Sequence, residues 1–151
     1  MRTLQVANGD LQLDSGGRLQ FVTGSNKLSQ DIALWLEEEY GIGYTTPNFG
    51  STLNGLIGTA ITQGAASQIQ AEVQRILSLY SAQQVQSLKL AQQNSQLSYY
   101  NKSEIIQNVS DITVSQGTGF VQVNVLINTL NNSTVALNLL ITPNGIQVNN
   151  G

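Results

Sequence analysis

The sequence contains no cysteine and no histidine. Without cysteine the chain can form no disulfide and offers no thiolate to a substrate or a metal. Without histidine it lacks the most common metal ligand in proteins and the usual general base at neutral pH. Catalytic triads and metal centres built on these two residue types are therefore excluded.

Charge is also scarce. Charged residues make up 10% of the chain and the formal net charge is −3, whereas about a quarter of an average soluble sequence is charged. The basic residues are scattered, and binding to nucleic-acid phosphates needs them clustered, so we expect no nucleic-acid partner. They are Arg2, Arg18, Lys27, Arg75, Lys89 and Lys102.

Long apolar runs are absent as well. No segment reaches membrane-spanning length, and the residues up to Asp14 alternate instead of forming the apolar core of a signal peptide. We therefore expect no membrane partner, and a chain that is made and kept in a cytoplasm or built into a particle there. No cofactor is expected, because the chain has no P-loop or dinucleotide glycine pattern and no Asp-x-Asp run for calcium.

The patterns that are present predict one α+β domain. With 151 residues, of which 40% are hydrophobic, the chain is long enough for a single domain with its own core. A β-hairpin is expected in residues 1–24, a helical part in 25–110 and an antiparallel sheet in 111–151. The hairpin surrounds the turn sequence at 14–17, and its apolar positions are Leu4, Val6, Leu11, Leu13, Leu19 and Phe21.

Two segments show the apolar spacing of amphipathic helices. The first is expected to begin with Ser25 or Asn26 as its cap and to run to about Tyr40, where Gly41 stops it. The second is expected over residues 63–93 and would span about 45 Å, so its distal half should project or lie along a neighbour. The apolar positions of the two helices are Leu28, Ile32, Trp35, Leu36, and Ile69, Val73, Ile76, Leu77, Tyr80.

Three consecutive glutamates, Glu37, Glu38 and Glu39, lie at the end of the first helix. Negative charge there opposes the helix dipole and does not stabilise the helix. These side chains are therefore either plainly solvated or contacts for a partner. The sequence leaves both interpretations open.

The stretch at residues 44–53 is the one around which we expect the helical part to be organised. Pro47 favours an extended residue before it, and Gly50 can adopt a positive φ that other residues resist. Ser51 can cap a short helix running through Ile57, and a further short helix is expected after Asn101, with Ser103 as a possible cap. The segment is either a well-specified loop between helices or a surface that binds a partner.

Phe49 is the aromatic residue of this stretch, and we expect it to pin the turn to a core. If the ring instead anchors a partner, Pro47, Phe49 and Gly50 form the first part of a candidate protein interface. These three residues are one half of the interface hypothesis.

The last third of the chain alternates in the manner of β-strands, and after Asp111 it contains no charged residue. Exposed sheet edges are normally guarded by charges or proline, because open N–H and C=O groups recruit other strands. The edge is therefore either covered within a monomer or meant to pair with another subunit by strand addition. The second case gives as candidate interface residues Val135, Leu137, Leu139, Ile141, Ile146 and Val148.

Nine carboxylates remain as candidates for acid–base chemistry. A glycosidase needs two of them at one of two characteristic separations. None lies in an apolar, glycine-bounded stretch of the kind that keeps a catalytic carboxyl protonated. We therefore expect no catalytic residue and no enzyme, although a glycosidase stays as the alternative.

Three segments, at residues 10–21, 30–36 and 40–53, together resemble one family. They include Gln-Asp-Ile at 30–32 and the turn Pro-Asn-Phe-Gly at 47–50. The chain resembles the sheath-initiator family of baseplate wedge proteins in contractile phage tails, historically labelled lysozyme-like and related to type VI secretion baseplate components. The order of long helix and β-rich end also matches, although the Glu-Pro-Arg triplet that many members carry after the long helix is missing.

The resemblance implies a structural virion protein of the tail baseplate, assembled in the host bacterial cytoplasm. Such a protein docks the first sheath ring by strand exchange and is present in several copies per baseplate. Its implied partners are the tail sheath protein, the baseplate wedge proteins and the tube and hub proteins. The alternative function is a peptidoglycan-degrading glycosidase carried in the particle, and a related contractile injection machine is a further possible setting.

Overall fold

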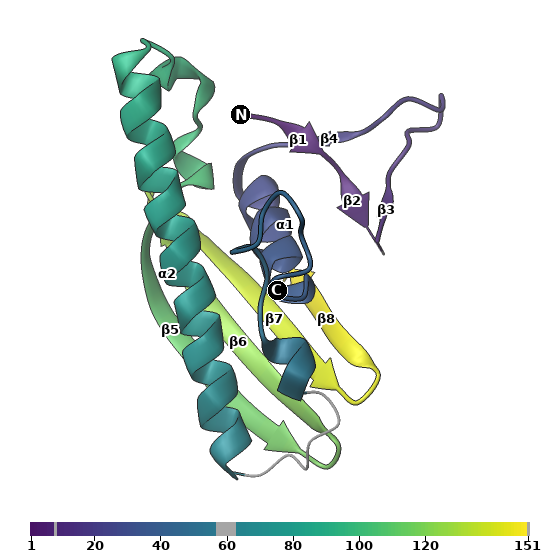
Figure 1. Cartoon of the computed structure of the whole chain (residues 1–151). Helices are drawn as coiled ribbons and strands as arrows, with labels where there is room; N and C mark the ends of the chain where they lie inside the picture. The colour runs from purple at the N-terminus through teal and green to yellow at the C-terminus, as the bar shows by residue number, and fades with distance from the viewer. Residues whose placement is uncertain (8, 57–62, 151) are drawn as a thin grey trace.

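The computed structural model describes residues 1–7, 9–56 and 63–150, and it has the predicted α+β fold (Figure 1). Helices α1 (Gly24–Glu37) and α2 (Gln63–Gln93) lie on one face of a four-stranded antiparallel sheet. The sheet is a meander in the order β5-β6-β7-β8. Its strands are β5 (Ile106–Gly117), β6 (Phe120–Thr129), β7 (Thr134–Thr142) and β8 (Gly145–Asn150).

The N-terminal hairpin is confirmed and consists of four very short strands. β1 (Thr3–Leu4) pairs with β4 (Phe21–Val22), and β2 (Val6–Ala7) pairs with β3 (Asp10–Leu11). Gln30 of α1 holds the hairpin, because its side-chain amide accepts from the Val6 N–H and donates to the Leu4 carbonyl, both at 2.8 Å. The alternating side chains of Leu11, Leu13, Leu19 and Phe21 do not join the core and are 45–56% exposed.

Helix α1 differs from its prediction at both ends. It begins at Gly24 after Thr23, which makes no side-chain cap, and it ends at Glu37, three residues before Tyr40. Glu38 is extended, and its carbonyl accepts the Ser51 N–H at 2.8 Å, while the Ser51 hydroxyl donates to the Leu36 carbonyl at 2.6 Å. The helix thus ends where Ser51, on the far side of the turn, binds the carbonyl groups of Leu36 and Glu38.

Helix α2 occupies the predicted residues. Ile57, through which we expected the preceding short helix to run, lies outside the described residues. Its distal half lies along its own chain. Gln84 donates to the Glu104 carbonyl at 2.6 Å and accepts the Ile106 N–H at 3.0 Å. The intervening segment contains the short 3-10 helices η2 (Leu97–Tyr99) and η3 (Lys102–Glu104).

Two predictions near η3 were wrong. Asn101, not Ser103, caps this helix, since its side chain accepts the Ser103 N–H at 3.1 Å. Ile106 begins β5, so the sheet starts before the expected residue 111. The start of β5 was obscured by two register shifts, between Ile106 and Asn108 and between Val109 and Asp111, which interrupt its alternation.

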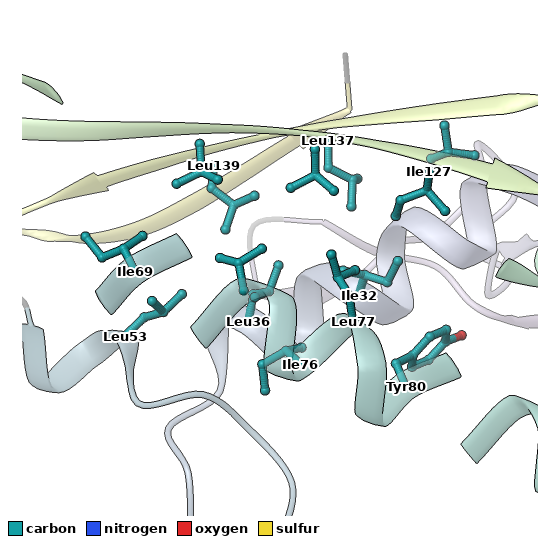
Figure 2. Close-up of a cluster of buried hydrophobic side chains, with 14 of the residues drawn as sticks. Ile32, Leu36, Leu53, Ile69, Ile76, Leu77, Tyr80, Ile127, Leu137 and Leu139 are labelled. Atoms are coloured by element: carbon teal, nitrogen blue, oxygen red, sulfur yellow. The ribbon is translucent and has the colours of Figure 1, made fainter. Parts of the chain in front are cut away.

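The core fills the space between the two helices and the sheet (Figure 2). Leu137 and Leu139 of β7 and Ile127 of β6 point toward the helices, and Ile32, Leu36 and Leu77 point back toward the sheet. Ile76 lies on the side of α2 away from the sheet, and Leu53 of the 3-10 helix η1 (Leu53–Leu56) lies at one end. These side chains are 0–1% exposed. The predicted helical stripe of α2 is therefore confirmed as core.

Candidate functional site

The turn at residues 44–53 has the conformation that its sequence predicted. Phe49 N–H donates to the Thr46 carbonyl at 3.0 Å, which closes a turn over Pro47. Gly50 has φ +98°, and a Cβ at this position would lie 2.8 Å from the Glu38 carbonyl oxygen. Only glycine fits here, because the backbone is in the left-handed region and a second strand of chain passes against it.

Ser51 links the turn to both neighbouring elements. Its hydroxyl accepts the Leu53 N–H at 3.4 Å at the start of η1, as predicted for a cap, and also donates to Leu36 at the end of α1. Tyr40 N–H donates to the Ser51 carbonyl at 2.9 Å, so that Glu39 and Ser51 form a parallel bridge.

An ion pair on α2 holds the same turn in place. The Glu72 carboxylate accepts the Thr52 N–H at 2.7 Å and is bound by the Arg75 guanidinium at 2.6 and 2.7 Å. The hydrogen bonds from Arg75 lower the pKa of Glu72, although partial burial opposes the shift, and the same pair raises the pKa of Arg75. The negative charge of Glu72 therefore holds the turn through the Thr52 N–H and the Arg75 guanidinium.

The predicted interface residues of the turn fall into different environments. Pro47 is exposed, Gly50 is buried, and Phe49 is half-buried with its ring 4.6 Å from that of Trp35. Sequence reasoning missed Ile42 and Tyr44, which are 62% and 101% exposed in the same loop. An apolar residue and an aromatic residue flanking the Gly43 position were the available signal.

A cavity of about 290 Å³ lies between α1, α2 and the segment before β5. It combines apolar and polar side chains. The aromatic residues that line it are Trp35, Phe49, Tyr80 and Tyr100. Burial, followed by the neighbouring Asp31 carboxylate, raises the pKa of Tyr80, so this phenol stays protonated as a hydrogen-bond donor.

Two carboxylates also line this cavity, and both have structural partners. Asp31 accepts the Tyr80 hydroxyl at 2.8 Å and forms an ion pair with Lys27. Glu104 accepts the Gly24 N–H at 2.9 Å. A hydrolytic pair needs one carboxyl free to donate a proton and one free to attack or to activate water, whereas these groups hold the start of α1 and the helix pair together.

The β7 residues of the interface hypothesis lie in the core of the protein. Val135, Leu137, Leu139 and Ile141 are 0–6% exposed, and β7 is paired on both sides, with β6 and β8. As side chains they cannot contact a partner of the folded chain. A meander places its last strand at the edge, so the candidate edge is β8.

Strand β8 carries the other two predicted interface residues, Ile146 and Val148, which are half-buried against the core. The two-residue turn at 143–144 makes Thr142 and Gly145 a hydrogen-bonded pair, and such pairs alternate along an antiparallel ladder. The N–H and C=O groups of Ile146 and Val148 therefore point away from β7, toward the open side of the sheet.

Glu37 meets this open side of β8. The Glu37 carboxylate faces the backbone N–H of Val148, and both residues line the two hollows beside β8. The surrounding residues remove enough water from this carboxyl group to raise its pKa, and the Val148 N–H partly offsets that shift. One of the three glutamates left open by the sequence is thus a contact of the sheet edge.

The other edge of the sheet is protected differently. Strand β5 has two bulge-like register shifts and the charged residue Asp111, and Gln70 of α2 donates to the outward carbonyl of Ile112 at 3.3 Å. Bulges, charge and a covering helix are the usual means of blocking strand addition. The two edges are therefore not equivalent as pairing surfaces.

No protein-family model, curated protein or solved structure matches this chain. Within residues 1–7, 9–56 and 63–150, no group of three or more acidic, histidine or cysteine side chains could hold a metal ion. In the same part of the chain, no helix is both long and apolar enough to cross a membrane.

Proposed function

We propose that this protein is a non-enzymatic assembly component of a contractile tail baseplate that starts the sheath by strand addition at β8. The observation that carries the proposal is the uncharged outer strand of the sheet, whose Ile146 and Val148 backbone groups face outward. Main-chain hydrogen bonds supply the affinity in strand addition. The resemblance of residues 10–21, 30–36 and 40–53 to sheath initiators names the partner, the sheath subunit of the same particle.

The exposed turn supports contacts with further baseplate partners. Tyr44 and Ile42 project from a loop that Gly50, Ser51 and the Glu72 ion pair hold in place. A rigidly held loop with exposed aromatic and aliphatic side chains is suited to anchor a partner, because little conformational entropy is lost on binding. We assign this loop to the wedge or tube side of the baseplate.

The enzymatic alternative receives no support from the cavity, since Asp31 and Glu104 are both engaged in structural hydrogen bonds. The test of the proposal is sheath assembly seeded by purified protein. Adding the full chain to the sheath subunit should shorten the lag of polymerisation, followed by light scattering and electron microscopy.

Two matched proline variants locate the edge. Val148→Pro removes an outward N–H of β8 without removing a ladder hydrogen bond, and Val114→Pro does the same on β5, where Val114 shares the outward register of Ile112. Both valines are half-buried against the core. Seeding should be lost in the first variant and kept in the second, with circular dichroism confirming that both are folded. Unchanged seeding by folded Val148→Pro would overturn the proposal.

A further inference from the structure

A groove runs along the open side of β8. One wall is the outer side of β8 from Ile146 to Asn149, and the other is the N-terminal hairpin at Gln5, Val6, Ala7 and Gly9. The floor is helix α1, including Ser29, Gln30 and Glu37. Its two adjoining hollows measure about 440 and 480 Å³, so an extended segment lying against β8 would enter a shaped space and not open solvent.

Glu37 is the charged group of this groove. The residues that line the two hollows include no lysine and no arginine. Glu37 is also the last residue of α1, where the carbonyl ends of the helix add to the negative potential. The groove therefore attracts positive charge that the lining residues do not supply.

Strand addition at β8 changes the surroundings of Glu37. The Val148 N–H, which now faces Glu37 across the groove, would be taken by a carbonyl of the incoming strand. The Glu37 side chain is exposed in the free protein, and an incoming strand would cover it. A carboxylate that is covered without a partner disfavours the complex. A cation on the incoming strand would pair with the Glu37 carboxylate and remove this cost.

We propose that Glu37 determines which strand β8 accepts: an extended segment of the sheath subunit that is uncharged except for one lysine or arginine facing Glu37. This inference rests on the proposed function, and it adds a selection rule to it. In the absence of that strand, Glu37 faces the Val148 N–H and disfavours pairing of β8 with other uncharged strands, including the β8 of a second copy.

The test uses the full chain and labelled peptides whose binding is followed by fluorescence anisotropy. The probe is an acetylated hexapeptide, Thr-Val-Lys-Val-Thr-Val, and its partner has glutamine in place of lysine. The wild-type protein should bind the lysine peptide about fivefold more tightly, as expected for one partly exposed ion pair. Added salt should reduce this preference.

Glu37→Gln should bind both peptides equally, and Glu37→Lys should disfavour the lysine peptide. Glu38→Gln is the matched control, because Glu38 is an adjacent exposed carboxylate and the structure ties it to Ser51 through its backbone carbonyl. Its preference should equal that of the wild type.

Equal binding of both peptides by the wild type would overturn the selection rule while leaving strand addition intact. Binding of neither peptide would overturn it as well, and the proline variants of β8 and β5 would then decide separately whether the sheath docks at this edge. A preference that survives in Glu37→Gln would assign selection to another group and also refute the inference.

Discussion

Replacing Gly50 with alanine should lower the free energy of unfolding by about 3 kcal/mol. One part of this cost is conformational, since φ at Gly50 is +98° and a side chain in a sparsely populated region costs about 1–3 kcal/mol. The other part is steric. The added Cβ would lie 2.8 Å from the Glu38 oxygen and 2.9 Å from the Glu39 oxygen, distances that the chain cannot keep.

Relief of that contact requires the two passing segments to separate. The hydrogen bonds between them are Ser51 N–H to the Glu38 carbonyl, at 2.8 Å, and Tyr40 N–H to the Ser51 carbonyl, at 2.9 Å. Each contributes about 1 kcal/mol net. A conformational cost of about 1 kcal/mol plus the loss of both hydrogen bonds, at about 1 kcal/mol each, gives the expected destabilisation of about 3 kcal/mol.

Two other glycines separate the conformational cost from the steric one. Gly41 has φ +86° with no atom within 4 Å of its would-be Cβ, so Gly41→Ala should cost only about 1 kcal/mol. Gly55 has neither a positive φ nor a close neighbour. Gly55→Ala should change the stability by less than about 0.5 kcal/mol or raise it slightly.

The assay is urea unfolding followed by the fluorescence of Trp35, the single tryptophan, whose ring lies against Phe49. The order of destabilisation should be Gly50→Ala, then Gly41→Ala, then Gly55→Ala. If Gly50→Ala matched Gly41→Ala, the close approach of the two segments would be refuted. If it matched Gly55→Ala, the left-handed turn would be refuted too.

Three further outcomes are expected in the same assay. Phe49→Ala should cost about 2 kcal/mol, because the ring is half-buried on Trp35, and a cost near zero would contradict that contact. Leu137→Ala should cost about 3 kcal/mol, since its side chain is 1% exposed; a cost below 1 would contradict its place in the core. Glu72→Gln should cost about 2 kcal/mol at neutral pH. Arg75 lowers the folded-state pKa of Glu72 below 4.5, so this stabilisation exists above pH 4.5 and is lost as the pH falls through the folded value, and the wild-type and variant curves should converge in acid.

The parts of the fold that follow local rules could be predicted from the sequence. The bounds of α2 follow from an apolar stripe with no interruption by proline. The strands β6 and β7 follow from alternation, and the positive φ at Gly50 follows from its place after Phe49 in a turn. In each case a few neighbouring residues carry the information.

The predictions that were wrong concern contacts between residues far apart in the chain. Helix α1 ends early, where Ser51 binds the carbonyl groups of Leu36 and Glu38, and nothing in residues 36–40 reports that. The alternation of β7 predicted a strand but not its neighbours. Leu137 was therefore assigned to an interface, although β7 is paired on both sides and the Leu137 side chain is buried under the helices. The contact of Glu37 with Val148 joins an α1 side chain to the last strand and has no local signature at all.

If β8 is the docking edge that we propose, this separation explains how the strand itself can remain uncharged. A lysine or proline within β8 would block the edge permanently, because it is part of the strand that any partner must pair with. Glu37 belongs to α1 and reaches β8 only through its side chain. Under our proposal, a partner displaces it by supplying one carbonyl and one cation, without unfolding any element of the core. Our proposal therefore requires the guarding charge to lie on the neighbouring helix and not in the strand that pairs with the partner.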